Sequence, residues 1–329
     1  MTYTQPTISV VAPVYNEEQL VEEFCRRVTA ALEPLGEPFE IVLVNDGSRD
    51  RSPLLMREIH ERDLRVKVVY FSKNFGHQLA ITAGTDYAQG QAVVVIDSDL
   101  QDPPEVIPEL IAKWREGYEV VYAVRSEREG ETWFKTFTAA LFYRLIVKIT
   151  NVDIPVDTGD FRLMDRKVVD SLARIREHHR FMRGLSVWVG FRQAGVPYKR
   201  HARKAGDTKY PLRKMLKFAL DGITSFSYLP LQMATYLGFI TAALSLVFLI
   251  AVVMMRLLYS GAPTDTAFYG QASTLAMVLF IGAVQLVSIG IIGEYVGRIY
   301  DEVKGRPLYI VSDALGFEEE QPYGLRQRR

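Results

Sequence analysis

The stretch Val93-Val-Val-Ile-Asp-Ser-Asp-Leu-Gln-Asp-Pro-Pro104 combines a strand pattern with a cluster of acids. Its four leading residues are β-branched and apolar, which predicts a strand buried on both faces of a sheet. Asp97, Asp99 and Gln101 follow directly. Ligands of open α/β sheets bind beyond the carboxyl ends of the strands, and oxygen ligands there suit Mg²⁺ or Mn²⁺. The stretch therefore predicts a metal–phosphate site, although an isolated Asp-x-Asp usually marks only a turn.

Strand and helix patterns alternate over residues 7–125. Strands are expected at Ile8–Ala12, Glu40–Val44, Val66–Phe71, Ala92–Ile96 and Val120–Val124. Helices are expected at Glu17–Leu35, Pro53–Arg62, Leu79–Ala88 and Glu105–Glu116. This alternation predicts an α/β fold around a doubly wound, mostly parallel sheet. The glycine-rich fingerprints of dinucleotide-binding and P-loop proteins do not occur, which disfavours both classes.

Composition narrows the class of protein. The chain has 39 Lys and Arg residues and 39 Asp and Glu residues, so the formal net charge is zero. Without a global basic field, no nucleic-acid partner is expected. Cys25 is the single cysteine, which fits a reducing compartment and leaves no internal disulfide. No signal peptide is expected, because Met1–Pro6 is polar and the apolar run after it is short.

Polar residues also follow the first two expected strands. Tyr15 and Glu17 come after the first, and Asp46 ends the second. Asp46 could accept hydrogen bonds from a nucleobase or ribose, or it could form only an Asx turn with Gly47. Glu17 could be a ligand contact, or only an acid favoured in the first turn of a helix.

Five motifs together resemble one enzyme family. They are Pro13-Val-Tyr-Asn-Glu17, Asn45-Asp-Gly-Ser48, Ser72-Lys-Asn-Phe-Gly-His-Gln78, Asp97-Ser-Asp-Leu-Gln-Asp-Pro-Pro104 and Val156-Asp-Thr-Gly-Asp-Phe-Arg-Leu-Met164. In this order and spacing they resemble the family-two glycosyltransferases of GT-A type, and within them the polyprenyl-phosphate subgroup. That subgroup includes bactoprenol glucosyltransferases and dolichol-phosphate mannose synthases. The resemblance implies a GT-A catalytic domain, a nucleotide-sugar donor, a polyprenyl phosphate acceptor and a divalent metal.

The resemblance also implies roles for individual residues. Asp97, Asp99 and Gln101 would bind the metal, and Asp160, preferred over Asp157, would face the reacting centre. Arg125 and Lys135 would bind the acceptor phosphate; Arg suits bidentate contact with phosphate. Donor contacts would come from Pro13, Tyr15, Glu17, Asp46, Lys73, Asn74, Asp97, Arg203 and Lys209. For Arg203 and Lys209 the alternative is a basic collar beside a membrane.

The last third of the chain is apolar. Leu229–Met255 and Ala272–Gly293 carry no charge, and each exceeds the ~20 residues that cross a bilayer. Pro211–Tyr228 reads as an interfacial amphipathic helix, with a buried surface helix as the alternative. Basic residues lie outside the two runs, whereas the loop Leu257–Ser273 has no Lys or Arg, which predicts both termini in the cytoplasm, with Arg256 near the outer end of the first run. The expected parts are a catalytic domain 1–210, the amphipathic helix 211–228, two spans (229–256 and 272–295) within 229–297, and a tail 298–329.

These observations predict an enzyme of the plasma membrane that transfers one sugar with inversion. The processive synthases' Gln-x-x-Arg-Trp motif is absent, which favours transfer of a single sugar. UDP-glucose and undecaprenyl phosphate are the leading substrates; GDP-mannose or another UDP-sugar is the alternative donor. A phosphate acceptor is already ionised at neutral pH, so Asp160 is expected to orient a substrate as much as to take a proton. A lipid-linked sugar flippase and an inactive scaffold are the rival classes, and a homo-oligomer is compatible with the sequence.

Overall fold

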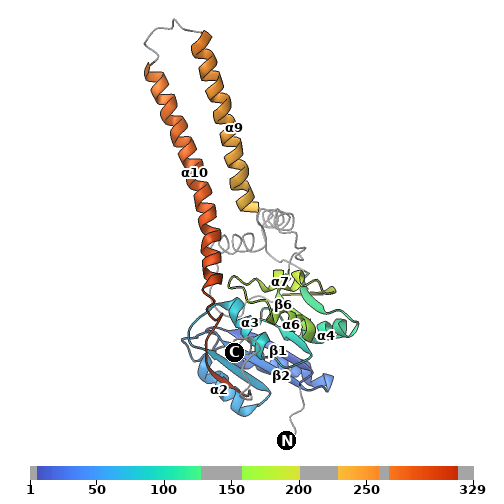
Figure 1. Ribbon diagram of the computed structural model, residues 1–329. Coiled ribbons are helices and arrows are strands. Elements are labelled where there is room, and N and C mark those ends of the chain that lie inside the picture. Colours follow the sequence, from blue (N-terminus) through green and yellow to red (C-terminus); the bar gives the residue numbers. More distant parts are fainter. Residues whose placement is uncertain (1–5, 127–157, 201–228, 259–266, 318–329) are drawn as a thin grey trace. The chain divides into compact units, whose positions relative to one another are not determined.

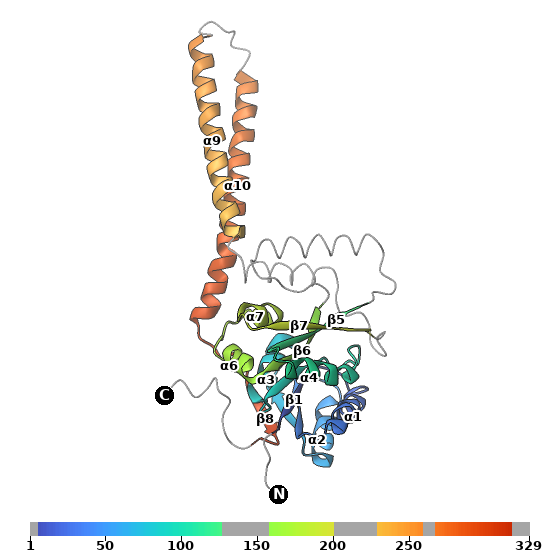
Figure 2. The same ribbon diagram turned by 90° about the vertical axis from the view of Figure 1, so that its right-hand side faces the viewer.

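Figures 1 and 2 show a computed structural model of the chain, which describes residues 6–126, 158–200, 229–258 and 267–317. The chain divides into two compact units. The sheet unit comprises Met1–Lys148, Val152–Met215 and Pro307–Arg329. The helical unit comprises Ile149–Asn151 and Leu216–Arg306. Each unit is described by itself below.

The sheet unit is built on a mixed sheet with the strand order β7-β5-β6-β4-β1-β2-β3-β8. The strands are β1 Ile8–Val14, β2 Phe39–Asn45, β3 Val66–Phe71, β4 Ala92–Val95, β5 Val120–Arg125, β6 Thr158–Asp165, β7 Gln193–Tyr198 and β8 Val311–Leu315. The pairs β1–β2, β1–β4, β2–β3 and β5–β7 are parallel, whereas β6 runs antiparallel to β4 and β5. The mostly parallel sheet is confirmed. A buried strand has the same apolar pattern whether it runs parallel or antiparallel to its neighbours. The sequence therefore did not predict that β6 runs antiparallel.

Helices cover both faces of this sheet. They are α1 Val21–Leu32, α2 Ser52–Arg62, α3 His77–Tyr87, α4 Ile107–Arg115, α6 Arg166–Ala173 and α7 Met182–Trp188, with 3₁₀ turns η1 Glu33–Leu35 and η2 Pro104–Val106. Helix α1 buries Val21, Phe24, Cys25, Val28 and Leu32, which recur at helical spacing along one face. The helix begins four residues after the expected start at Glu17. The segment before the helix turns instead towards the end of β2.

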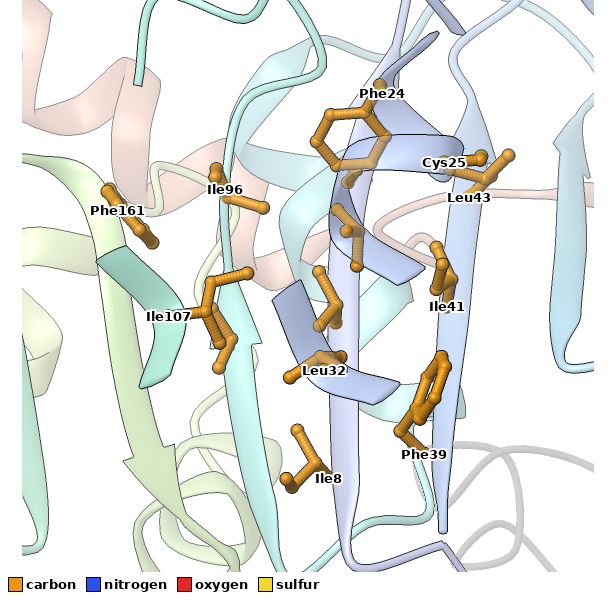
Figure 3. Close-up of a cluster of buried hydrophobic side chains, with 14 of the residues drawn as sticks. Ile8, Phe24, Cys25, Leu32, Phe39, Ile41, Leu43, Ile96, Ile107 and Phe161 are labelled. Carbon is orange, nitrogen blue, oxygen red and sulfur yellow. The ribbon is translucent and has the colours of Figure 1, made fainter. Parts of the chain in front are cut away.

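The main core lies between β1, β2, β4 and the helices α1, α2 and α4. Figure 3 shows Phe24 and Leu32 of α1 among side chains of the strands, including Ile8, Ile41 and Ile96. The predicted central strand is confirmed, since Val93 to Ile96 are at most 1% exposed. The other face is covered by α3, where a Cβ at Gly84 would lie 2.2 Å from Cγ1 of Val11. This close approach packs α3 directly on β1.

The helical unit contains α9 Leu229–Leu258 and α10 Ala267–Val303, which lie side by side in both views. Leu229–Ala251 and Met277–Val303 are long and apolar enough to cross a membrane, with mean hydropathies of 2.1 and 2.0. Helix α10 continues beyond the expected end at residue 295 to Val303. The expected amphipathic helix 211–228 lies outside the described residues.

The segment after α10 differs from the expected tail. Residues 311–315 form β8, which pairs antiparallel with β3 at the edge of the sheet (Figure 2). The short sequence Val-Ser-Asp-Ala-Leu has too weak an alternation to predict a strand, and only its pairing with β3 makes it one. Residues 318–329 of the expected tail lie outside the described residues.

Candidate active site

The acids predicted from the strand ends converge at one edge of the sheet. Asp46 follows β2, and Asp97 lies two residues after the end of β4. Strand β6 runs the other way and pairs Arg162 with Val95, and His77 Nε2 lies close to both Asp160 and Asp97 just beyond this pairing. The reversed direction of β6 therefore brings its first residues, and not its last, to the carboxyl ends of β1, β2 and β4.

Asp160 is buried, and both of its carboxylate oxygens accept hydrogen bonds. Oδ1 accepts from Arg183 Nε at 2.9 Å. Oδ2 accepts from Gln78 Nε2 at 3.2 Å and Arg183 Nη2 at 3.3 Å, and lies 3.1 Å from His77 Nε2. Burial opposes ionisation, but Arg183 and His77 hold the pKa of Asp160 well below its usual range. The group is thus an ionised carboxylate whose oxygens are held by protein side chains in place of water.

His77 connects the two acids that face each other. Its Nε2 lies 3.1 Å from Oδ2 of Asp160 and 3.5 Å from Oδ1 of Asp97. Desolvation of the ring lowers its pKa, but Asp97 and Asp160 together raise the pKa of His77 to about 9. His77 begins α3, and its motif was visible in the sequence, but no pattern there indicated a link to Asp160.

Asp97 has an acceptor atom without a donor. Its Oδ1 is buried and has no hydrogen-bond partner among the described residues, and it lies 3.5 Å from Nε2 of His77. Desolvation raises the pKa of Asp97 to about 6, and the nearby acids Asp160, Asp102 and Asp99 add to this effect. An open carboxylate oxygen among like charges fits a divalent cation.

The other predicted metal ligands lie in the turn after Asp97. Oδ1 of Asp99 accepts from the backbone N–H of Gln101 at 3.1 Å. Oε1 of Gln101 accepts from Arg200 Nη2 at 2.8 Å, so a metal would have to share that oxygen. Among the described residues, no group of three or more His, Cys, Asp and Glu side chains forms a metal cage. A cation here would need further oxygen ligands from water and a phosphate, as Mg²⁺ commonly does.

Arg125 lies beside this turn, in a second cluster around the buried Asp102. The hydroxyl of Tyr198 donates to Oδ1 of Asp102, and Arg200 Nε lies 3.2 Å from the same oxygen. Nε of Arg125 donates to the Tyr198 hydroxyl at 3.4 Å. A Cβ at Gly159 would lie 3.0 Å from Nη2 of Arg125, so this guanidinium passes close to the start of β6. The predicted phosphate ligand Arg125 therefore reaches the neighbourhood of Asp160.

Asp46 is held by the loop that precedes α3. Its carboxylate accepts from the backbone N–H groups of Phe75 at 2.7 Å and Gly76 at 3.1 Å. Its carbonyl accepts from Nδ2 of Asn74 at 3.0 Å. Burial raises the pKa of Asp46, and the two backbone donors oppose this shift. The carboxylate of Asp46 is thus engaged by this loop, and the nearby Ser48 N–H donates to Oδ1 of Asn45 at 3.1 Å.

The segment after β1 lies beside the loop that follows Asp46. The N–H of Glu17 donates to Oγ of Ser52 at 2.9 Å, and the carbonyl of Pro13 accepts from Oγ of Ser98 at 2.8 Å. The side chain of Tyr15 is 38% exposed. Lys73 lies in the loop before α3, with its Nζ 5.0 Å from the centre of the Phe75 ring. These predicted donor contacts come from neighbouring segments of the same sheet edge, whereas the candidates Lys135, Asp157, Arg203 and Lys209 lie outside the described residues.

Comparison with known proteins decides the family. Residues 9–173 match the model of glycosyl transferase family 2. The chain belongs to this family. It is 53% identical over 96% of its length to the uncharacterized glycosyltransferase YkcC of Bacillus subtilis (strain 168), of which 96% is covered. It is 41% identical over 92% of its length to the prophage bactoprenol glucosyl transferase homolog of Escherichia coli (strain K12), of which 98% is covered.

Solved structures resemble the chain more remotely. Glucosyl-3-phosphoglycerate synthase from Mycobacterium tuberculosis, in complex with Mn²⁺, UDP and phosphoglyceric acid, has a TM-score of 0.47 and 22% identity. The match covers 65% of this chain and 75% of that one. The mixed, mostly parallel sheet and the family together give this glycosyltransferase the GT-A type of fold that the resemblance implied.

Two arginines of this glycosyltransferase site were not candidates in the sequence. Arg183 lies on α7 and pairs with Asp160 from a position 23 residues later in the chain. Arg200 follows β7 and joins Gln101 and Asp102. A helix with one buried face gives no signal of which acid an arginine will reach. Only the packing of α7 and β7 against β5 and β6 brings these guanidinium groups to the acids.

Proposed function

We propose that this glycosyltransferase transfers a single sugar from a nucleotide sugar to a polyprenyl phosphate, with inversion of the anomeric carbon. UDP-glucose is the proposed donor, and undecaprenyl phosphate is the proposed acceptor. The relative in Escherichia coli that is named a bactoprenol glucosyl transferase homolog supports this acceptor. The two apolar helices support an enzyme that meets its acceptor in a membrane.

The observation that carries the proposal is the environment of Asp160. Four contacts from Arg183, His77 and Gln78 occupy its two oxygens. A carboxylate with a strongly lowered pKa is a weak general base, because it gains little by taking a proton. An alcohol acceptor would need a better base. A phosphate monoester arrives ionised at neutral pH and needs none.

Asp160 then acts by orientation. Its negative charge holds Arg183 and His77 in place beside Asp97, and these two cations face the region where the phosphates of both substrates would meet. Arg125 would contact the acceptor phosphate, together with Lys135, since a guanidinium can donate two parallel hydrogen bonds to phosphate oxygens. The acceptor oxygen would attack the anomeric carbon on the side opposite the leaving nucleoside diphosphate.

A divalent metal, Mg²⁺ or Mn²⁺, would be held by Asp97 and Asp99, with Gln101 as a further ligand. When bound, it would supply Lewis-acid stabilisation of the leaving diphosphate. The open Oδ1 of Asp97 supports this proposal. Arg203 and Lys209 would add positive charge on the same diphosphate. Asp46, Tyr15 and Glu17 would hold the nucleoside, with Pro13, Lys73 and Asn74 shaping the rest of its site.

We also propose a location at the plasma membrane, with two spans and both termini in the cytoplasm. The single native cysteine, Cys25, is 5% exposed and gives little background labelling. A cysteine placed at Thr266, between the helices, should react with an impermeant reagent outside intact cells, and one at the exposed Leu64 should not. Labelling of Leu64→Cys alone would reverse the proposed orientation.

The function is tested with the purified full chain in lipid nanodiscs. Radiolabelled UDP-glucose, other UDP-sugars and GDP-mannose are each offered with undecaprenyl phosphate or with unphosphorylated undecaprenol. Transfer is expected to the phosphate alone and to be fastest from UDP-glucose. Equal transfer to undecaprenol would exclude the hypothesis that the ionised acceptor phosphate attacks without the help of a general base. Translocation of a preformed lipid-linked sugar without transfer would point to a flippase, and neither activity would point to a scaffold.

A further inference from the structure

The loop from Ser72 to His77 joins the two halves of the site. Phe75 and Gly76 donate backbone hydrogen bonds to Asp46, and His77 reaches Asp97 and Asp160. The loop has no regular secondary structure between β3 and α3. A Cβ at Gly47 would lie only 2.5 Å from the backbone nitrogen of Asn74, so the loop packs tightly on the turn after β2. Small shifts of this loop would therefore move Asp46 and His77 together.

The other side of this loop is contacted by the segment that follows α10. The N–H of Ser72 donates to the carbonyl of Ile310 at 3.0 Å, just beyond the strand pairing of β3 with β8. The ring of Tyr309 stacks on Phe71 with centroids 5.2 Å apart and planes 18° apart. Phe71 in turn meets the edge of Phe75, with centroids 5.5 Å apart. Aromatic contacts thus run from Tyr309 to the residue whose N–H binds Asp46.

Tyr309 is anchored at its other end. Its hydroxyl donates to Oδ2 of Asp86 at 2.7 Å, near the last turn of α3. Asp86 has a side chain only 2% exposed and also pairs with Arg176 through contacts of 2.7 and 3.1 Å. Tyr309 therefore connects the end of β3 with the end of α3, the two elements on either side of the loop. Burial of the phenol raises its pKa, and nearby Asp86 adds to this, so the hydroxyl stays a donor.

We propose that Tyr309 is a positioning residue for nucleotide binding, which acts through its ring contacts with the loop that precedes α3. This inference rests on the proposed function only in taking the loop 72–77 as a donor-binding element. The plain alternative is that β8 merely covers the open edge of β3. That alternative accounts for the strand, but Tyr309 lies outside the strand pairing and its ring contacts reach the loop.

Tyr309 follows the second apolar helix closely in the sequence. Only a few residues separate Tyr309 from the last residue of α10, Val303. The chain therefore passes from α10 within a few residues to Tyr309, whose ring contacts reach the loop 72–77. A nucleotide that orders the loop and a membrane that holds α10 would act on neighbouring residues of one continuous segment.

The test uses three variants of the full chain in nanodiscs. Tyr309→Leu removes the ring stack and the hydroxyl, and Tyr309→Phe removes the hydroxyl alone. Asp313→Asn is the matched control on β8, because it breaks only the exposed ion pair with Arg57, 2.7 Å long. Hydrogen exchange is followed in peptides that contain residues 72–79, and the Kd for UDP with Mg²⁺ is measured by titration.

Tyr309→Leu is expected to speed exchange of the loop amides and to raise the Kd about tenfold, while kcat at saturating donor stays within about twofold. Tyr309→Phe should have a smaller effect of the same kind, and Asp313→Asn none. Unchanged loop exchange in both Tyr309 variants would overturn the proposal, and if Tyr309→Leu does not fold, Tyr309→Phe decides by the same criterion. If the wild type fails to bind any nucleotide, the proposed function is lost, yet the exchange data still report whether Tyr309 orders the loop.

Discussion

The two ends of the central strands both contain buried charge, and they use it differently. At the amino ends, Glu40 and Lys67 form one ion pair 2.8 Å long, with side chains 3% exposed. Oε1 of Glu40 also accepts from Ser9 Oγ and the Gln89 N–H, each at 2.6 Å. At the carboxyl ends, several acids crowd together and Oδ1 of Asp97 has no hydrogen-bond partner among the described residues.

The comparison of the amino and carboxyl ends shows which charged groups indicate a ligand. One acid matched to one base and to neutral donors makes a closed structural network. Crowded acids with a raised pKa at Asp97 and an open oxygen leave room for an external cation. Burial differs between the two ends, since the side chain of Asp97 is 30% exposed and those of Glu40 and Lys67 are 3% exposed. The balance of charge also differs: Oε2 of Glu40 lies 2.8 Å from Lys67 Nζ, whereas Asp97 lies among the acids Asp99, Asp102 and Asp160.

The largest expected effect is a loss of stability at the amino ends of the strands, where Glu40 pairs with Lys67. Lys67→Met leaves the Glu40 carboxylate buried without its cation and should lower the free energy of unfolding by ~3–5 kcal/mol. Thermal melting of the full chain measures this loss, and the KM for the nucleotide sugar should be unchanged in the folded protein. Adding Glu40→Gln, which keeps an acceptor oxygen for Ser9 and Gln89, should recover most of the loss. A change in KM without a change in melting would break the comparison.

The carboxyl ends of the strands are tested by removing a proposed metal ligand. Asp99→Asn keeps an oxygen for the Gln101 N–H but loses the charge, and it should lower turnover on the order of 10²–10³. Its melting temperature should stay close to that of the wild type, in contrast to Lys67→Met. EDTA should abolish the wild-type activity, and added Mg²⁺ or Mn²⁺ should restore it. Full activity in EDTA would exclude the metal.

A smaller effect is expected from Asp160→Asn, which tests orientation against general-base catalysis. Misplacing Arg183 and His77 should lower the rate up to ~10²-fold. The pKa of Asp160 is depressed, so its carboxylate is ionised above its ordinary pKa of about 4 and does not titrate between pH 5 and 8. An acidic limb near pH 6 should then come from the acceptor phosphate, whose second pKa is about 6, and should persist in the variant.

This profile is measured at saturating Mg²⁺, so that the cation keeps Asp97 ionised throughout. Loss of the acidic limb in Asp160→Asn, beside a sloping wild type, would show that Asp160 is the base. Arg183→Gln is a matched control, because it leaves the Asp160 carboxylate in place while removing its strongest partner. It should lower the rate and leave the limb intact.

Local patterns in the sequence determined the elements and the acids of the site. The run Val93–Ile96 predicted the central strand, and Asp46, Asp97 and Asp99 were placed because ligands gather at strand ends. The same patterns gave the two long apolar helices. Each of these features is encoded within a few consecutive residues, and short-range periodicity is enough to read it.

Only the tertiary structure decided the partners. Asp160 meets Asp97 because β6 runs antiparallel beside β4, and Arg183 meets Asp160 because α7 packs on β6. Val311–Leu315 becomes a strand through its pairing with β3, and Tyr309 thereby reaches Phe71 and Asp86. Periodicity reports which face of an element is buried, but not what it is buried against. Register and packing over long sequence separations supply that information, and a single sequence does not carry it in readable form.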